Sequence, residues 1–395
     1  MSARAVTPRN RKPPYRFIAT ITFILALLHA LVGWSLLPDL LAPAWVRLLG
    51  VAWLTFSWLV LPLTIISRFI RHRGLADALG WVGSVTLGFF SSLLVLTVIR
   101  DIFVGIAMLF VHGAGPQEAQ YWSAAGVPCL AFFITLIGFV NARRRARVVD
   151  IAVPIENLPP ELEGFTIVQI SDIHVGPTIK RGYLARIVEA VNQLDPDIVA
   201  VTGDVVDGKP EHLASHVAPL AQLKARYGVY FVNGNHEYYS GEPAWSNEFA
   251  RLGLKVLKNH HEIIVHKGVK LLIAGVTDYT AEQFIPEERS DPAKAIEDAP
   301  ADAAVRILLA HQPRSADAAA GAGFDLQLSG HTHGGQFWPW NYFVRLQQPY
   351  TAGLHPHGKL WVYVSRGTGY WGPPKRFGAP SEITRIRLTR GAKTL

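Results

Sequence analysis

The first 147 residues alternate between long apolar segments and short loops that hold most of the charged side chains. Residues 17–37 contain no charged side chain, and a helix of this length, at about 1.5 Å per residue, crosses about 30 Å of hydrocarbon. Three further segments have the same character, at 48–66, 79–99 and 122–141. No small-residue cleavage site follows the first segment, which disfavours a cleaved signal peptide. We therefore predict a transmembrane region over residues 1–147 with four spans.

The loops of this region indicate its orientation. Basic residues gather before the first segment, between the second and third, and after the fourth: Arg4, Arg9, Arg11, Lys12, Arg16, Arg68, Arg71, Arg73, Arg143, Arg144, Arg145 and Arg147. The positive-inside rule then predicts a multi-pass protein of the inner (cytoplasmic) membrane, with both termini and the soluble part in the cytoplasm. Residues 102–112 are apolar but too short to span, and an added span there would reverse this orientation. For His29 and His112, packing or interface placement is favoured over function.

From residue 148 the pattern changes to short apolar runs that alternate with helix-like stretches. The runs at 165–171, 197–203, 229–234, 271–276, 305–310 and 326–330 are typical of buried strands. Helix-like stretches lie between several of them, at 181–194, 211–226 and 314–322. This alternation predicts a soluble α/β domain over residues 148–395.

The formal charge of +8 first suggests a nucleic-acid binder, but its distribution removes most of that support. Residues 1–147 carry a net charge of +10 and residues 148–395 a net charge of −2, so the basic excess lies in the membrane region. No nucleic-acid partner is expected. The single cysteine, Cys129, lies within an apolar run, so no intrachain disulfide can form.

Metal-binding side chains follow five of the predicted strands. They are Asp172 and His174, Asp204, Asn235 and His236, His311, and His331 and His333. The stretch LQLSGHTHGGQ alone also fits a hairpin turn with two solvated histidines, but five such strand ends do not fit chance. In open α/β sheets, ligand sites lie beyond the carboxyl ends of the strands. Imidazole, carboxylate and amide ligands without thiolate favour Mn²⁺, with Fe or Zn²⁺ as alternatives, and seven ligands from this set of eight side chains suit two ions.

The motifs SDIH, GDVVD, GNHE, LAHQP and GHTHGGQ, at 171–174, 203–207, 234–237, 309–313 and 330–336, resemble those of the calcineurin-like metallophosphoesterase superfamily. The resemblance covers residues 150–390 and implies a four-layer α/β/β/α sandwich that holds two divalent ions. It implies that Asp172, His174 and His333 bind one ion and that Asn235, His311 and His331 bind the other. Asp204 would bridge the two ions.

The resemblance also implies roles in the reaction. His236 would stand beside the reacting phosphate and donate a proton to the leaving oxygen or stabilise its charge. Asp207 is expected to orient His236, although a turn or helix cap is an alternative for this residue. A hydroxide held between the two ions is the expected nucleophile, because two cations lower the pKa of bound water.

The motif GHTHGGQ and the later segment 363–383 resemble the membrane-associated bacterial branch, which includes UDP-2,3-diacylglucosamine pyrophosphatases and less defined phosphodiesterases. Arg366 and Arg376 in that segment could bind a diphosphate or pair with acidic neighbours. The aromatic stretch FWPWNYF at 337–343 and Trp371 would suit acyl chains or the membrane interface, or could form core.

The leading hypothesis is hydrolysis of a phosphodiester or diphosphate bond of a membrane lipid. UDP-2,3-diacylglucosamine is the most specific candidate substrate, and it is a candidate only in an organism that makes lipid A. A broad phosphodiesterase acting on soluble nucleotides is the alternative within enzymes. A membrane sensor or scaffold with a regulatory metal site is an alternative of a different class. No oligomeric state is predicted.

Overall fold

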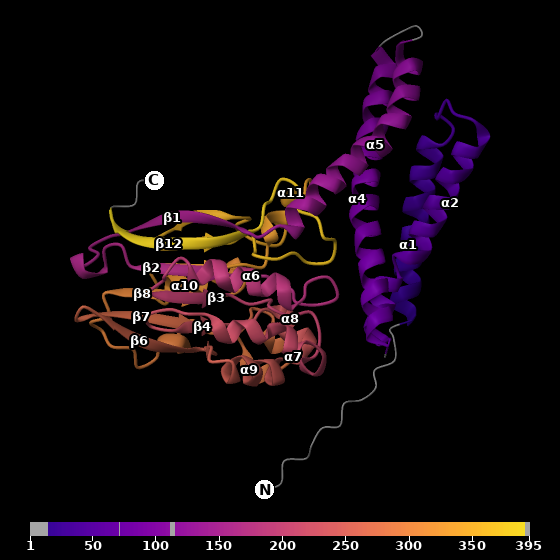
Figure 1. The fold of residues 1–395 in the computed structure, drawn as a ribbon. Coiled ribbons are helices and arrows are strands. Elements are labelled where there is room, and N and C mark those ends of the chain that lie inside the picture. Colours follow the sequence, from indigo (N-terminus) through magenta and orange to yellow (C-terminus); the bar gives the residue numbers. More distant parts are fainter. Residues whose placement is uncertain (1–14, 71, 111–114, 392–395) are drawn as a thin grey trace. The chain divides into compact units, whose positions relative to one another are not determined.

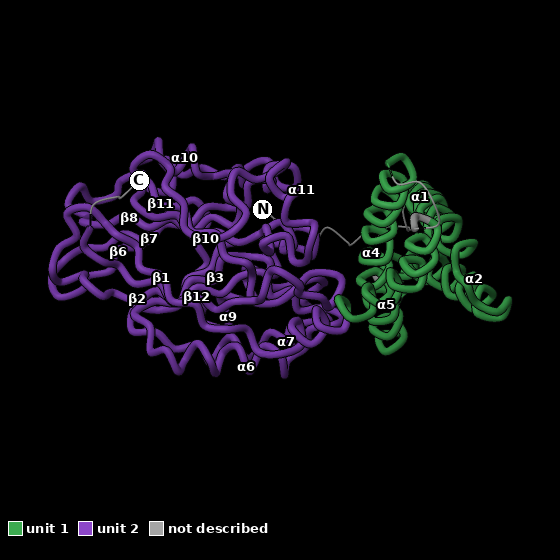
Figure 2. Tube along the Cα trace, turned by 90° about the horizontal axis from the view of Figure 1, so that it is seen from above, with its two compact units in different colours: residues 1–135 green, residues 136–395 purple. Residues whose placement is uncertain are grey.

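A computed structural model describes residues 15–70, 72–110 and 115–391, and the chain divides into two compact units, Met1–Thr135 and Leu136–Leu395 (Figure 2). The predicted arginines and lysine before residue 15, Arg71 and His112 lie outside the described residues.

The first unit consists of helices. They are α1 (Tyr15–Leu36), α2 (Ala44–Val60), α3 (Leu63–Ile66), α4 (Arg73–Phe110) and most of α5 (Gly115–Arg143) (Figure 1). Four stretches are long and apolar enough to cross a membrane: Tyr15–Leu36, Ala44–Ile66, Arg73–Phe110 and Gln117–Arg143. Residues 102–110 continue α4 and form no separate helix. The N-terminal part of the chain therefore has the four apolar helices that the hydrophobic pattern predicts.

Polar side chains in this unit are paired with one another. His29 Nδ1 lies 2.7 Å from the carbonyl oxygen of Leu25, and its Nε2 lies 3.0 Å from Ser57 Oγ on α2. Arg100 on α4 is buried and forms ion pairs with Asp39 and Asp101, while Gln120 on α5 donates to Asp39 at 2.7 Å. A buried charge in an apolar region is costly unless it is paired, so this network ties the α1–α2 loop to α4 and α5.

The second unit contains two six-stranded sheets (Figure 1). The first has the order β1 (Arg147–Ile155), β12 (Glu382–Arg390), β2 (Thr166–Ile170), β3 (Ile198–Val201), β4 (Val229–Phe231) and β5 (Lys255–Val256). The second has the order β10 (Gly353–His357), β11 (Leu360–Val364), β9 (Leu326–Ser329), β8 (Val305–Leu309), β7 (Val269–Gly275) and β6 (His260–His266). β2 to β5 run parallel to one another, as do β7, β8, β9 and β11.

Three apolar cores hold the layers together. Ile167 and Ile198 of the first sheet pack with Ile273, Ile307 and Leu328 of the second. The outer face of the first sheet is covered by α6 (Arg181–Asn192), α7 (Pro210–Val217) and α9 (Glu242–Arg251), and that of the second by α10 (Ala316–Gly321). Short helices α8 (Asn235–Ser240) and α11 (Trp340–Val344) complete the unit. The predicted α/β/β/α sandwich is confirmed.

The last turns of α5 belong to this second unit. Asn141 Nδ2 donates to the carbonyl oxygen of Arg376 at 3.1 Å, and the Arg376 amide donates to the Gly138 carbonyl oxygen at 2.8 Å. Arg143 donates to Tyr370 Oη and to the Thr178 carbonyl oxygen, each at 2.9 Å. The contacts therefore begin the unit at Leu136, whereas the change of composition placed the boundary at 148, because the helix continues past its apolar segment and packs on the sandwich.

We expect a fragment of residues 136–395 to unfold at a midpoint about 5 °C or more above that of residues 148–395. The shorter fragment lacks the hydrogen bonds of Asn141 and Arg143, each contributing on the order of 1 kcal/mol. Thermal unfolding followed by circular dichroism measures the difference. Asn141→Ala in the longer fragment should lower its midpoint part of the way toward that of the shorter fragment. Equal midpoints for the two fragments would contradict the assignment of these turns to the second unit.

Candidate metal centre

The loops after five parallel strands bring the predicted ligands to one edge of the two sheets. Asp172 and His174 follow β2, Asp204 follows β3, Asn235 follows β4, His311 follows β8, and His331 and His333 follow β9. Five of these seven residues have a positive φ: Asp172 at 53°, His174 at 56°, Asp204 at 53°, His331 at 69° and His333 at 53°. Residues with a side chain rarely adopt this conformation, and such strain concentrates at functional sites.

Glycines allow these loops to approach closely. A Cβ on Gly234 would lie 2.1 Å from Asp204 Oδ1, and a Cβ on Gly330 would lie 2.2 Å from Asp172 Oδ2. Both distances exclude a side chain. The glycine before each ligand-bearing turn is therefore required by the carboxylate that packs against it.

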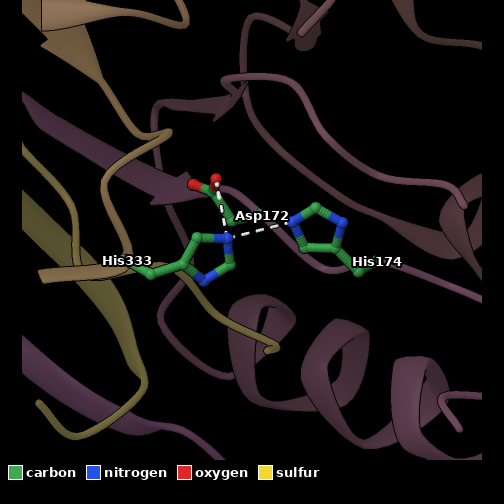
Figure 3. A group of neighbouring side chains, drawn as sticks. All are labelled: Asp172, His174 and His333. Carbon is green, nitrogen blue, oxygen red and sulfur yellow. Dashed lines mark hydrogen bonds and ion pairs between the residues drawn. The ribbon is translucent and has the colours of Figure 1, made fainter. Parts of the chain in front are cut away.

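Asp172, His174 and His333 form the first ligand group, and their side chains point toward one another (Figure 3). His174 Nε2 lies 3.0 Å from His333 Nε2, which lies 3.4 Å from Asp172 Oδ1. All three residues are buried. Two imidazole nitrogens and a carboxylate oxygen thus converge on one point.

Asp204, His311 and His331 form the second ligand group, with Asn235 beside them. His311 Nε2 lies 3.1 Å from Asp204 Oδ2, and His331 Nδ1 lies 3.1 Å from Asn235 Oδ1 and 3.3 Å from His311 Nε2. Asp204 Oδ2 also lies 3.9 Å from His174 Nε2 of the first group. Asp204 therefore stands between the two groups.

Asp207 joins a predicted metal ligand to the residue expected to transfer a proton. Its Oδ1 lies 2.6 Å from His236 Nδ1 and 3.0 Å from His174 Nδ1. The sequence predicted the pairing with His236, and the contact with His174 was missed because no spacing indicates it. A carboxylate on the far nitrogen of a ligating histidine commonly orients the ring, so Asp207 can fix both imidazoles.

The electrostatics of the site fit a cation-binding centre. Burial, together with the nearby Asp204 carboxylate, raises the pKa of Asp172. Burial lowers the pKa of His331 to about 3 and that of His333 well below its ordinary value. Burial thus keeps the imidazoles of His331 and His333 neutral, with a lone pair free for a divalent cation, whereas burial of His311 is outweighed by the Asp204 carboxylate, which raises its pKa well above the ordinary value. The donor set therefore fits two such ions.

Asp207 and His236 are shifted in the opposite sense. Burial acts to raise the pKa of Asp207, but the neighbouring imidazoles of His174 and His236 outweigh it and hold that pKa far below its usual range. Burial acts to lower the pKa of His236, and the carboxylates of Asp204 and Asp207 instead raise it to about 9. His236 is thus held as a cation at neutral pH.

Glu237 shapes the site without being a predicted ligand. Its buried carboxylate accepts backbone N–H groups of Asp204 at 2.9 Å, Gly234 at 2.7 Å, Val205 at 2.8 Å and Val206 at 3.2 Å. Burial and Asp204 raise its pKa to about 8, against the N–H groups that favour its ionised form. The motif GNHE contains this residue, but only the folded loops reveal that it anchors Asp204.

The two predicted arginines lie beside the first ligand group. Arg376 is fully buried and donates to the carbonyl oxygens of Gly369, His333 and Arg366, so the structure supports a positioning role for it rather than a phosphate contact. Arg366 is partly exposed and donates to Glu382 at 2.9 Å. Its contact with a substrate remains a prediction.

Two exposed aromatic side chains that the sequence did not assign to His236 flank it. The ring of Tyr239 lies 5.2 Å from the His236 ring, and that of Trp371 lies 5.7 Å from it, measured between centroids. They leave the imidazole 14% exposed, open enough for proton transfer to a bound group.

Comparison with known proteins places this site in a family. The model of the calcineurin-like phosphoesterase family matches residues 165–335. The chain is 37% identical over 295 residues to a transmembrane protein with metallophosphoesterase domain from Danio rerio, covering 72% of this chain and 67% of that protein. It is 38% identical over 269 residues to an uncharacterized metallophosphoesterase of Helicobacter pylori, covering 66% of this chain and 70% of the relative.

Among solved structures, a 5′-nucleotidase precursor from Thermus thermophilus matches 57% of this chain and 54% of its own, with a TM-score of 0.37 and 16% identity. That likeness is too weak to bear on the site. The family model matches the segment that contains all seven predicted metal ligands, and the sequence relatives extend well beyond it. The chain belongs to the calcineurin-like phosphoesterase family.

Proposed function

We propose that the protein is a metal-dependent phosphoesterase that hydrolyses a phosphodiester or diphosphate bond. The observation that carries this proposal is the position of Asp204, whose Oδ2 lies 3.1 Å from His311 of one ligand group and 3.9 Å from His174 of the other. Two divalent cations, Mn²⁺ by preference, would polarise the phosphoryl oxygens and lower the pKa of a water molecule when bound. Asp172, His174 and His333 would hold one ion, and Asn235, His311 and His331 the other.

His236 would protonate the leaving oxygen. Asp207 holds its Nδ1 at 2.6 Å, which turns Nε2 toward Asp204 at 3.9 Å and so toward the reacting phosphate. A cationic imidazole at neutral pH has the proton to give. Trp371 and Tyr239 cover two sides of this ring and limit the access of water.

We expect His236 to titrate near pH 9 in the metal-free protein, as followed by its imidazole signals in NMR. Because the folded state binds this proton more tightly than the unfolded state, protonation stabilises the fold. That contribution is complete below about pH 6.5 and is lost as the pH rises through about 9. Asp207→Asn should bring the pKa of His236 down, and an unchanged value in that variant would refute the pairing.

A membrane-lipid substrate is supported by an aromatic patch, which we define as Trp338, Trp340, Tyr342, Phe343, Leu346 and Trp371. All six side chains are exposed, at 37–81%. The Trp338 amide donates to the Phe377 carbonyl oxygen at 3.0 Å, and the adjacent Arg376 amide donates to Gly138 on α5. The patch thus lies on a segment bonded to the end of an apolar helix. Indole and phenyl groups favour the membrane interface, so the patch would contact lipid there.

The cytoplasmic face of the inner membrane is our proposal for this domain, from the basic residues that follow α5. UDP-2,3-diacylglucosamine remains the sharpest candidate substrate. Hydrolysis of soluble nucleotides is the second candidate, favoured by the polar lining of a cavity beside His331. The convergence of seven ligand side chains disfavours a scaffold without activity.

We expect the Mn²⁺-supplemented full-length protein in detergent to hydrolyse bis-p-nitrophenyl phosphate and UDP-2,3-diacylglucosamine, and Asp204→Ala to lose both activities by at least about 10³-fold. Removing the carboxylate between the ligand groups removes the point where both ions would meet. Hydrolysis of the chromogenic diester alone would keep the phosphoesterase and remove the lipid substrate. Wild-type rates in Asp204→Ala would contradict the proposed centre.

The double variant Trp340→Ser, Phe343→Ser tests the lipid hypothesis, with Val265→Ser as the control. It should lower the ratio of lipid to chromogenic hydrolysis in mixed micelles about tenfold, because less apolar surface would face the lipid. Val265→Ser removes an exposed apolar side chain from β6 and should leave that ratio unchanged.

A further inference from the structure

A cavity of about 290 Å³ opens beside the second ligand group. Asn235 and His331 line its inner side, and Thr280, Gln312, Arg314 and Gln348 line much of the rest. These four side chains are polar, and none of them belongs to either ligand group. A ligand in this cavity would therefore be in contact with the metal centre and with a polar wall.

A relay of hydrogen bonds fixes the orientation of two amides in this wall. The buried Asp278 carboxylate accepts the Thr280 amide at 2.9 Å, the Thr280 hydroxyl at 2.6 Å and Gln312 Nε2 at 3.1 Å. Gln312 Nε2 lies 3.1 Å from both oxygens of Asp278, so Gln312 presents its NH₂ group to that carboxylate and its Oε1 to Gln348. Gln348 Nε2 donates to that oxygen at 3.1 Å.

The relay leaves an acceptor at its end. Gln348 is 5% exposed, and its Oε1 has no hydrogen-bond partner within residues 15–70, 72–110 and 115–391. A buried acceptor without a donor is costly, and the relay prevents the amide from turning to relieve it. Oε1 is itself buried, so a ligand hydroxyl or amine reaches it and removes that cost when the Gln348 side chain, which lines the cavity, shifts toward the cavity.

Arg314 adds a positive charge at the same cavity. Its exposed side chain donates from Nε to the Gln347 carbonyl oxygen at 2.5 Å, and its guanidinium carbon lies 5.6 Å from the centre of the Tyr279 ring. These contacts hold the guanidinium in place, and its terminal nitrogens make no hydrogen bond to the described part of the chain. A fixed guanidinium next to a phosphoester centre suits an anionic oxygen.

We propose that this cavity is the subsite for a hydroxyl-bearing alcohol group of the phosphoester, such as a polyol, sugar or nucleoside. A hydroxyl of that group would donate to Gln348 Oε1, and Arg314 would contact a phosphate oxygen. The inference rests on the proposed phosphoesterase activity and specifies the polar half of its substrate. An acyl chain does not suit this wall, so the lipid part of a substrate would extend toward the aromatic patch.

Two diesters with the same leaving group test the subsite in the Mn²⁺-loaded full-length protein. They are 2,3-dihydroxypropyl p-nitrophenyl phosphate and propyl p-nitrophenyl phosphate, which differ only in the two hydroxyl groups. We expect kcat/KM to favour the dihydroxypropyl ester about tenfold or more, because a site built to bind a hydroxyl discriminates against an analogue that lacks it. Gln348→Met should reduce this ratio to within about twofold of unity.

Further variants separate the two contacts. Gln348→Asn withdraws the acceptor by one methylene and should also lower the ratio, which covers the case in which Gln348→Met does not fold. Arg314→Gln should raise KM for both esters by a similar factor and leave their ratio unchanged, because both esters carry the same charge. Gln193→Leu, at the exposed end of α6, should keep the wild-type ratio.

The outcomes are distinguishable. Equal hydrolysis of both esters by the wild type would overturn the subsite and leave the phosphoesterase standing. A preference that survives in both Gln348 variants would overturn the assignment of Gln348. Hydrolysis of neither ester, with the protein folded and Mn²⁺ bound, would overturn the proposed function itself.

Discussion

The structure depends on the crowding of acidic and imidazole groups at one edge of two sheets. Asp172, Asp204 and Glu237 are buried after the ends of the neighbouring strands β2, β3 and β4, and Asp204 contributes to raising the pKa of the other two carboxyls. Like charges held together out of water are unstable unless cations compensate them. Three features hold this arrangement in place. They are the positive φ of five candidate ligands, the glycines that pack against carboxylates, and the backbone N–H groups that donate to Glu237.

The clustering of the candidate ligands could be predicted from the sequence because each stands at a fixed place after a buried strand, and strand ends share an edge. Asp207 was predicted as the partner of His236 from the family resemblance, by its place three residues after Asp204. The supporting residues could not be found in this way. Glu237 acts on backbone amides, Arg376 acts from a segment that only tertiary packing brings to His333, and Gln348 becomes an orphan acceptor only through Asp278 and Gln312.

The start of the second unit also could not be predicted from composition alone. The composition changes from apolar to charged near residue 148, but the last turns of α5 already form hydrogen bonds to the sandwich through Asn141 and Arg143. Those turns contact the segment around Arg376, which in turn holds His333 and leads to the aromatic patch. An apolar helix therefore ends on the segment that supports a ligand, and this makes the end of α5 part of the catalytic unit.

Electron paramagnetic resonance of the full-length protein during titration with Mn²⁺ tests the central claim most directly. The account predicts that two ions bind per chain and that their spins are exchange-coupled, because the two ligand groups share Asp204. Asp204→Ala should remove the coupled signal. Saturation at one ion per chain, or two ions with the uncoupled six-line signals of isolated Mn²⁺, would contradict a shared two-ion centre.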